Sequence, residues 1–172
     1  MSLHFIPIGE HNRSLFERMM QQYCAELDQN RGKTTPPEVL KKWIDSILDL
    51  QAKGDPDRHL EYCYIDDTPI GFLYGKVDHP HHRGYKKVGW GYIMEFFVIP
   101  PYRRNGFGCE MQQHLEELFL ADGTNKLYLT TASKEGEAFW WAMGFRPTDE
   151  ISPENGDRIY TKELHYENFD QR

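Results

Sequence analysis

The stretch FFVIPPYRRNGFGCEM, residues 96–111, constrains the fold more than any other part of the chain. Its opening residues are aromatic and β-branched, which is typical of a buried strand. Pro100 and Pro101 end that strand, because proline lacks the amide hydrogen that a sheet needs. Gly106 and Gly108 follow, and a helical pattern of apolar residues comes after them. The sequence therefore predicts a strand, a short turn and a helix that begins near Gly106.

Hydrophobic spacing predicts the elements on either side of this stretch. Apolar residues recur every four positions in the first helical segment, which places Tyr23 on its core face, and Trp43 lies on the core face of the second. The expected order is a strand at 3–8, helices at 12–28 and from 36, strands at 59–65, 69–77 and 88–99, a helix from 106, a strand at 126–132, a helix at 134–143 and a strand at 158–164.

This order predicts an α/β fold in which helices cover a mixed sheet. The chain has 172 residues, with no internal repeat and no break in composition. That length suits one domain with a single sizeable core, so a single domain over residues 1–172 is expected.

Composition and charge exclude several classes of protein. The net charge of −7 argues against a general nucleic-acid binder, which carries the opposite sign. No apolar run approaches the roughly 20 residues of a membrane span, and the N-terminus lacks the pattern of a signal peptide. Cys24, Cys63 and Cys109 lie far apart, which argues against disulfides and a structural zinc site. A cytoplasmic protein without nucleic-acid or membrane partners is expected.

The turn before the predicted helix has the chemistry of an anion site. Amides at a helix N-terminus have no internal partners and favour phosphate, and glycine lets the main chain approach a ligand. Arg103 and Arg104 add positive charge that pairs with phosphate oxygens. No Gly-Lys-Ser/Thr follows, as a Walker loop requires, and no third glycine, as a Rossmann motif requires. The residues alone leave two interpretations, a diphosphate cradle or a plain turn with surface arginines.

The segment MEFFVIPPYRRNGFG, residues 94–108, together with AFWWAMGF, residues 138–145, resembles the GNAT superfamily of acetyl-CoA-dependent N-acetyltransferases. That family's signature is an apolar strand, a proline, an aromatic residue and then Arg/Gln-x-x-Gly-x-Gly/Ala. A later Gly-Phe pair closes the last helix. The resemblance covers about residues 88–146. EFFV is also similar to the same strand in spermidine/spermine acetyltransferases, which leaves the substrate open.

The resemblance implies a mixed, mostly antiparallel central sheet flanked by helices, and acetyl-CoA as cosubstrate. By resemblance, the main chain of Phe96–Val98 pairs with the pantetheine arm, and the Val98 amide polarises the thioester carbonyl. By the same resemblance, the amides of the glycine loop, Arg104–Cys109, hold the pyrophosphate. The cofactor-binding residues implied in this way are Phe96, Phe97, Val98, Arg103, Arg104, Asn105, Gly106, Phe107, Gly108, Cys109, Ser133 and Trp140.

Glu95 is the candidate general base. It adjoins the cofactor segment, and its apolar neighbours are of a kind that raises the pKa of a carboxyl group. A base is needed because the acceptor amine arrives as ammonium. The alternative is that Glu95 faces the other side of the sheet in an ion pair, since Glu95 and Phe96 point in opposite directions along a strand.

Two positions depart from the family pattern. Ser133 stands where the family often has an asparagine that touches the cofactor. Trp140 stands where many members have a tyrosine that protonates the leaving thiolate, and an indole cannot act as that acid. We therefore expect Trp140 to be a packing wall beside the cofactor's thiol end, with water or the amine's own proton serving the thiolate.

The histidines His79, His81 and His82 invite a metal interpretation, but they lack a nearby fourth ligand, so no metal site is expected. A solvated loop, or one rim of the acceptor pocket, is favoured.

The sequence thus predicts transfer of an acetyl group from acetyl-CoA to a primary amine of a small molecule or peptide. A non-catalytic acyl-CoA binding or sensing module of the same fold is the alternative. Homodimer formation is left open.

Overall fold

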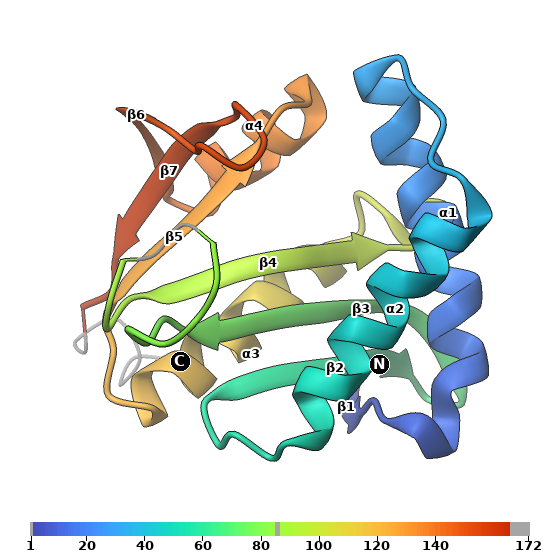
Figure 1. Cartoon of the computed structure of the whole chain (residues 1–172). Helices are drawn as coiled ribbons and strands as arrows, with labels where there is room; N and C mark the ends of the chain where they lie inside the picture. Colours follow the sequence, from blue (N-terminus) through green and yellow to red (C-terminus); the bar gives the residue numbers. More distant parts are fainter. Residues whose placement is uncertain (1, 85–86, 166–172) are drawn as a thin grey trace. The chain divides into compact units, whose positions relative to one another are not determined.

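The computed structural model describes residues 2–84 and 87–165, and it divides into two compact units (Figure 1). One consists of Met1–Tyr74 and Glu95–Met111, and the other of Gly75–Met94 and Gln112–Arg172. Strands β3 and β4 and helix α3 each begin in one unit and end in the other. The prediction that residues 1–172 form a single domain stays a prediction.

The strands form one mixed sheet in the order β1-β2-β3-β4-β5-β7-β6, which confirms the expected fold class. The ladders of β1 with β2, β5 with β7 and β6 with β7 are antiparallel, and β4 is parallel to β5. The recorded register between β4 and β5 joins Gly91 to Leu127 and Tyr92 to Tyr128, at the start of β4. The expected cofactor segment, Phe96–Val98, lies further along the strand.

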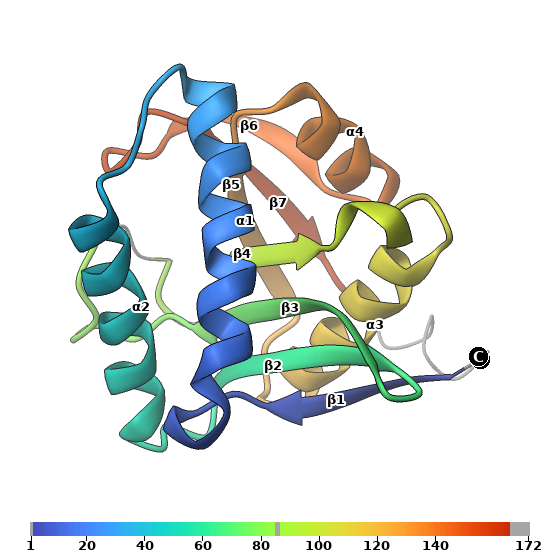
Figure 2. The ribbon, with the colours of Figure 1, turned by 90° about the vertical axis from the view of Figure 1, so that its right-hand side faces the viewer.

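The first unit contains two long helices on a sheet. Its elements are β1 (Leu3–Pro7), a 3-10 turn (Glu10–Asn12), α1 (Arg13–Arg31), α2 (Pro37–Ala52), β2 (Arg58–Ile65), most of β3 (Thr68–Val77), the second half of β4 (Gly91–Val98), a 3-10 turn (Pro100–Tyr102) and the first turn of α3 (Phe107–Ala121). Gly32 ends α1 in the left-handed conformation, with φ of 63°. Figure 2 shows α1 crossing β2 and β3, with α2 beside it.

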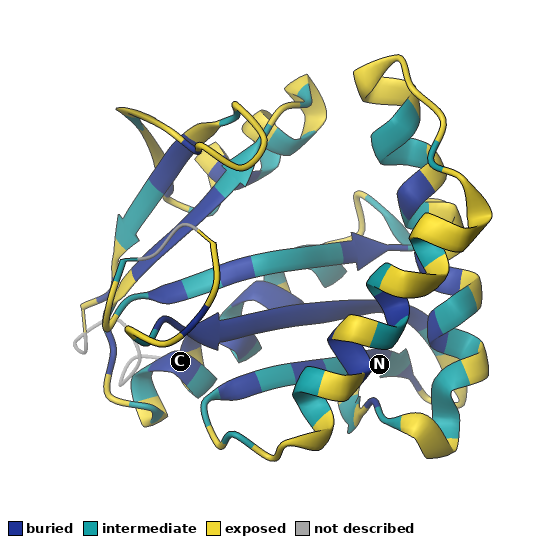
Figure 3. Ribbon diagram, in the orientation of Figure 1, coloured by how far each residue is buried: buried dark blue, intermediate teal, exposed yellow. Residues whose placement is uncertain are grey.

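The side chains of this unit pack on both faces of its strands. On one face, α1 buries Phe16, Met19, Met20 and Cys24. On the other, Val98 of β4 and Met111 of α3 join the buried cluster of Cys63, Ile65 and Ile70. Strand β3 is buried along nearly its whole length, whereas the outer sides of α1 and α2 are exposed (Figure 3).

The second unit contains the C-terminal strands. Its elements are the end of β3, the start of β4, the rest of α3, β5 (Lys126–Thr131), α4 (Lys134–Ala142), β6 (Arg146–Ile151) and β7 (Arg158–Glu163). The start of β4 lies at Gly91 and not at Val88, because residues 87–90 form a turn in which Trp90 N donates to Lys87 O at 2.8 Å.

Strand β6 was absent from the expected order, and that order is wrong at this point. Its sequence, RPTDEI, contains a proline and charged residues, and nearly all of it is exposed. Such a strand has no alternating apolar pattern, because it lies at the sheet edge and pairs only with β7.

Among the described residues, none of the helices is both long and apolar enough to cross a membrane.

Candidate active site

The second half of β4 directs alternate side chains to opposite faces of the first unit. Phe97 points towards α1, where its ring lies 5.7 Å from that of Tyr23, centroid to centroid. Phe96 and Val98 point the other way and pack with the cluster that includes Met111. Glu95, two residues before Phe97, accordingly faces α1, where it shares a hydrogen bond with Tyr23. Glu95 thus lies on the face opposite to Phe96 and Val98, and its hydrogen-bonded partner there is a tyrosine. Its role as the base stays a prediction.

The surroundings of Glu95 make it a carboxyl group that titrates near neutrality. Burial raises the pKa of Glu95 from 4.5 to about 7, against the opposing effects of the Tyr23 hydrogen bond and the positive charge of Arg31. Part of the residue's surface nevertheless remains accessible to solvent. A base with a pKa near the working pH combines a useful ionised fraction with a useful proton affinity. Glu95 can therefore exchange protons at neutral pH.

Aromatic rings and one buried cation complete the surroundings of this carboxyl group. Tyr23 also contacts the rings of Trp43, at 6.3 Å, and Phe72, at 5.8 Å. Tyr74 of β3 is buried, and its hydroxyl accepts a hydrogen bond of 2.6 Å from Arg58 Nη1. Electrostatic repulsion from Glu95 contributes to the raised pKa of Tyr74, although burial is the larger cause.

Arg103 has a different position from the one that the sequence suggested. Its Nε donates to the Val98 carbonyl at 2.7 Å, and its Nη2 pairs with both carboxylate oxygens of Glu26 on α1, at 2.9 and 2.8 Å. The guanidinium also lies 5.6 Å from the centre of the Phe97 ring. The side chain thus ties the end of β4 to α1. Its main chain is also hydrogen-bonded, since Arg103 N donates to Pro100 O at 3.1 Å and Arg103 O accepts from Asn105 Nδ2 at 2.9 Å. A role of Arg103 in holding the cofactor stays a prediction.

The glycine loop has a backbone shape suited to an anion. Arg104 and Gly106 both lie in the left-handed region, with φ of 62° and 84°. An added Cβ at Gly106 would meet nothing within 4 Å, so the space beside the main chain is open. The first helical amides of α3 follow at once, since Glu110 N donates to Gly106 O at 3.2 Å and Gly106 therefore caps the helix. Successive amides in such a turn form an anion-binding concavity.

The predicted residues Asn105, Phe107, Gly108 and Cys109 lie in the first unit, whereas Ser133 and Trp140 lie in the second. Ser133 caps α4, and its hydroxyl accepts a hydrogen bond of 2.9 Å from Gly136 N. Trp140 is buried, and its ring contacts those of Phe139 at 4.7 Å and Phe145 at 5.4 Å, both edge to face. Trp140 is thus packed against protein side chains, and the expectation that it also forms a wall beside the cofactor stays a prediction. The roles of Ser133 and Trp140 toward the cofactor stay predictions.

The acetyltransferase (GNAT) family model matches residues 16–145. The chain belongs to this family. Members of this family are acyltransferases. The matched range includes Glu95, the glycine loop and Trp140, so the resemblance drawn from the sequence is confirmed.

Individual relatives agree with this assignment. The chain is similar to N-alpha-acetyltransferase 50 of Danio rerio, with 31% identity over 86 residues, and the match spans about half of each protein, 48% of both. It has the fold of the PaiA N-acetyltransferase of Thermoplasma acidophilum, solved with coenzyme A (TM-score 0.72, 16% identity, 95% of this chain and 100% of that one). It also has the fold of Arabidopsis thaliana Naa50 in complex with the bisubstrate analogue CoA-Ac-MVNAL (TM-score 0.60, 18% identity, 95% and 100%).

The histidine loop is exposed at Pro80, His81, Arg83 and Gly84, as a solvated loop is, but not at His82. His82 is buried, and its Nδ1 lies 3.0 Å from Nζ of the buried Lys76, which also pairs with Asp78 at 3.3 Å. The rings of His79, His81 and His82 pack against one another. Residues 85–86 of this loop lie outside the described residues. Across residues 2–84 and 87–165, no group of three or more His, Cys, Asp or Glu side chains could hold a metal ion.

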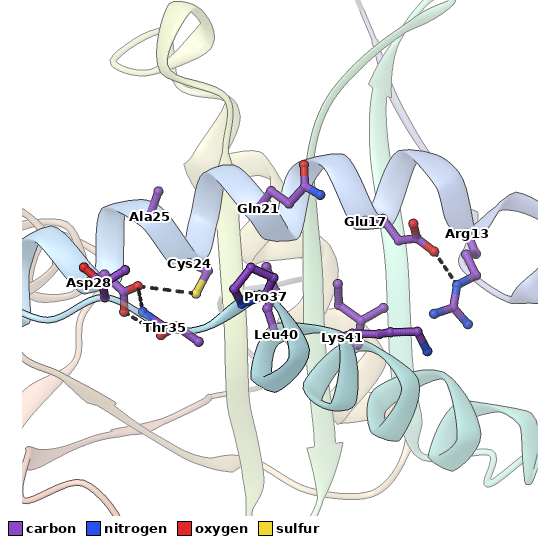
Figure 4. Close-up of a pocket in the computed structure, with 12 residues that line it drawn as sticks. Arg13, Glu17, Gln21, Cys24, Ala25, Asp28, Thr35, Pro37, Leu40 and Lys41 are labelled. Carbon is purple, nitrogen blue, oxygen red and sulfur yellow. Dashed lines mark hydrogen bonds and ion pairs between the residues drawn. The ribbon is translucent and has the colours of Figure 1, made fainter.

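A cavity of about 570 Å³ lies between α1 and α2 (Figure 4). Its floor is largely apolar, with Cys24, Leu40 and Ile44, and Asp28 closes one end by accepting hydrogen bonds from Thr35 N at 2.6 Å and Thr35 Oγ1 at 2.8 Å. Neither Tyr23 nor Glu95 lines this cavity, so it is separate from the titrating carboxyl group.

Tyr23 lies on the core face of α1, as helical spacing predicted, but its contact with Glu95 was not predicted. It is only partly buried, whereas Phe16, Met19, Met20 and Cys24 are the buried residues of α1. The sequence did contain one signal. A tyrosine hydroxyl needs a hydrogen-bond partner when it is buried, so a tyrosine on an apolar helix face implies a polar group opposite it. Nothing in the local pattern indicated that the partner is Glu95.

Proposed function

We propose that this acetyltransferase moves the acetyl group of acetyl-CoA to a primary amine of a small molecule or peptide, with Glu95 as the general base. The observation that carries the proposal is the Glu95 carboxyl group, whose pKa burial raises to about 7 while part of the residue stays accessible. A carboxylate in these surroundings is suited to take a proton from an ammonium ion near pH 7.

The residues of the glycine loop fit the cosubstrate. The left-handed Arg104 and Gly106, the open space at Gly106 and the start of α3 together suit a pyrophosphate group. Acetyl-CoA, when bound, supplies an acetyl group already activated as a thioester. The Arg103 guanidinium holds the Val98 carbonyl and so fixes the peptide plane at the end of β4. That plane carries the Ile99 amide, which donates to Ile70 O at 2.8 Å. The role of the Val98 amide, as a donor toward the acetyl oxygen, stays an expectation from the family resemblance.

The chain's own part in the reaction is proton transfer and positioning. Glu95 takes one proton from the acceptor's ammonium group and leaves a neutral amine. The amine nitrogen then forms a bond to the acetyl carbon while the bond from that carbon to sulfur breaks. The second proton of the nitrogen passes to the departing thiolate, directly or through water, and Glu95 returns its proton to solvent. Atoms and charges balance without a dedicated acid, in keeping with the indole at Trp140.

The acceptor is an amine of a small molecule or of a peptide. The similarity to N-alpha-acetyltransferase 50 supports a peptide N-terminus, but it covers only half of each protein. The panel of acceptors should therefore contain a polyamine, an aminoglycoside, a peptide with a free N-terminus and an N-terminally blocked peptide with a free lysine.

The test is release of free thiol from acetyl-CoA across this panel, with Glu95→Gln as the variant. We expect the rate with the accepted amine to fall by roughly 10²–10⁴ in Glu95→Gln, while acetyl-CoA affinity measured by calorimetry changes little. Glu38→Gln, which removes an exposed carboxylate from α2, is the matched control and should keep the rate. If the rate and pH profile of Glu95→Gln equal those of the wild type, Glu95 is not the base. Binding of CoA without thiol release for any amine would instead favour the non-catalytic module.

A further inference from the structure

Tyr23 connects the central helix of the first unit to the proposed base. It lies on α1, and its ring contacts those of Phe72, Phe97 and Trp43, with centroids 5.8, 5.7 and 6.3 Å away. Its hydroxyl is hydrogen-bonded to the Glu95 side chain and also to the main chain of Phe96. The ring is therefore held by packing, and its hydroxyl reaches Glu95 and Phe96, the first residue of the expected cofactor segment.

The direction of these hydrogen bonds follows from the protonation states. Burial and the negative charge of Glu95 raise the pKa of Tyr23 well above 10, so the hydroxyl stays protonated throughout the physiological range. The Phe96 main chain can only donate to the hydroxyl oxygen through its amide, and this contact lowers the pKa of Tyr23, as a donor does. The hydroxyl proton is thus directed at Glu95, where it favours the ionised carboxylate.

We propose that Tyr23 is the positioning residue for the general base of the acetyl transfer: its hydroxyl holds the Glu95 carboxylate in one orientation and in its proton-accepting form. This inference rests on the proposed function of Glu95 as base. Tyr23 itself does not exchange a proton during the reaction. It sets the pH at which Glu95 becomes competent and the direction in which the free carboxylate oxygen points.

The other charged and titratable groups around Glu95 act differently. Arg31, also on α1, is exposed and contributes only the smaller of the two effects that favour the carboxylate. Tyr74 of β3 accepts its hydrogen bond from Arg58 of β2, and the negative charge of Glu95 adds to the effect of burial in raising the pKa of Tyr74. Tyr23 is therefore the side chain whose removal should move the titration of Glu95 most.

The variant Tyr23→Phe removes the hydroxyl and keeps the ring. We expect the acidic limb of the kcat/KM profile to move up by about one pH unit, which lowers kcat/KM at pH 7 by about fivefold and lets it recover near pH 9. Tyr62→Phe is the matched control, since the Tyr62 hydroxyl also ties α1 to the sheet, donating to Asn12 O at 2.6 Å, without contacting Glu95. Its profile should keep the wild-type midpoint.

A second measurement separates this inference from the proposed function. Carboxyl ¹³C NMR of protein labelled at glutamate, with the Glu95 signal assigned by its absence in Glu95→Gln, gives the titration of Glu95 without any substrate. A higher midpoint in Tyr23→Phe than in the wild type shows that Tyr23 favours the Glu95 carboxylate, as the inference requires. If Glu95→Gln nevertheless proves fully active, the base assignment fails and the positioning role fails with it. An unchanged Glu95 midpoint in Tyr23→Phe overturns the inference, whatever the enzyme activity shows.

Discussion

Replacing Glu95 by Gln should stabilise the protein at alkaline pH while it disables the proposed chemistry. The folded state raises the pKa of Glu95 from 4.5 to about 7, so it binds this proton more tightly than the unfolded chain does. As pH rises from about 4.5 to 7, the unfolded chain loses the proton first, and the free energy of unfolding of the wild type falls. Above pH 7 Glu95 is ionised in the folded state as well, and the free energy of unfolding is lowered by the full cost of burying the carboxylate. Gln carries no charge at any pH and can still accept the Tyr23 hydrogen bond, so the variant escapes this penalty.

The magnitude follows from the two pKa values. At about 1.36 kcal/mol for each pH unit, the difference between 4.5 and about 7 corresponds to about 3 kcal/mol. The partial exposure of Glu95 makes this an upper value. Urea unfolding at pH 4.5, 6, 7 and 8 measures it: the wild type and Glu95→Gln should coincide near pH 4.5 and diverge to between about 1 and 3 kcal/mol at pH 8. Glu38→Gln should show no such divergence. A gap for Glu95→Gln that is the same at every pH would refute the reasoning.

Two further predictions concern the cosubstrate. Gly106→Val should lower CoA affinity at least ~10-fold, about 1.4 kcal/mol, with the fold intact by circular dichroism. Gly123→Val, at a glycine with similar φ of 89° and open space around it, controls for backbone strain and should keep CoA affinity by calorimetry. Trp140→Phe should lower kcat by less than ~10-fold, whereas Trp140→Ala should weaken acetyl-CoA binding and the exposed Trp141→Ala should not. A Trp140→Phe variant without turnover, yet with normal cofactor affinity, would show that the indole N–H takes part in the chemistry.

Local features of the sequence determined much of this protein. The strand, double proline and glycine loop of residues 96–108 fixed where β4 ends and α3 begins, because proline and glycine act on the backbone of their own positions. The 3.6-residue and two-residue periods predicted the helices and all strands except β6. The same short-range pattern was sufficient to indicate the family that residues 16–145 match.

Tertiary structure decided which side chains meet. Arg103 has the same sequence context whether it faces a phosphate or Glu26, and only the packing of α1 against β4 directs it to Glu26 and the Val98 carbonyl. Strand β6 exists because β7 offers it a ladder, not because its own residues favour a sheet. The sequence placed Tyr23 on the core face of a helix and Glu95 on a strand, but it did not indicate that the two side chains meet. The pKa of Glu95 depends on burial and on a hydroxyl group from a distant part of the chain, and a sequence pattern records neither, because both arise only when α1 packs on the sheet.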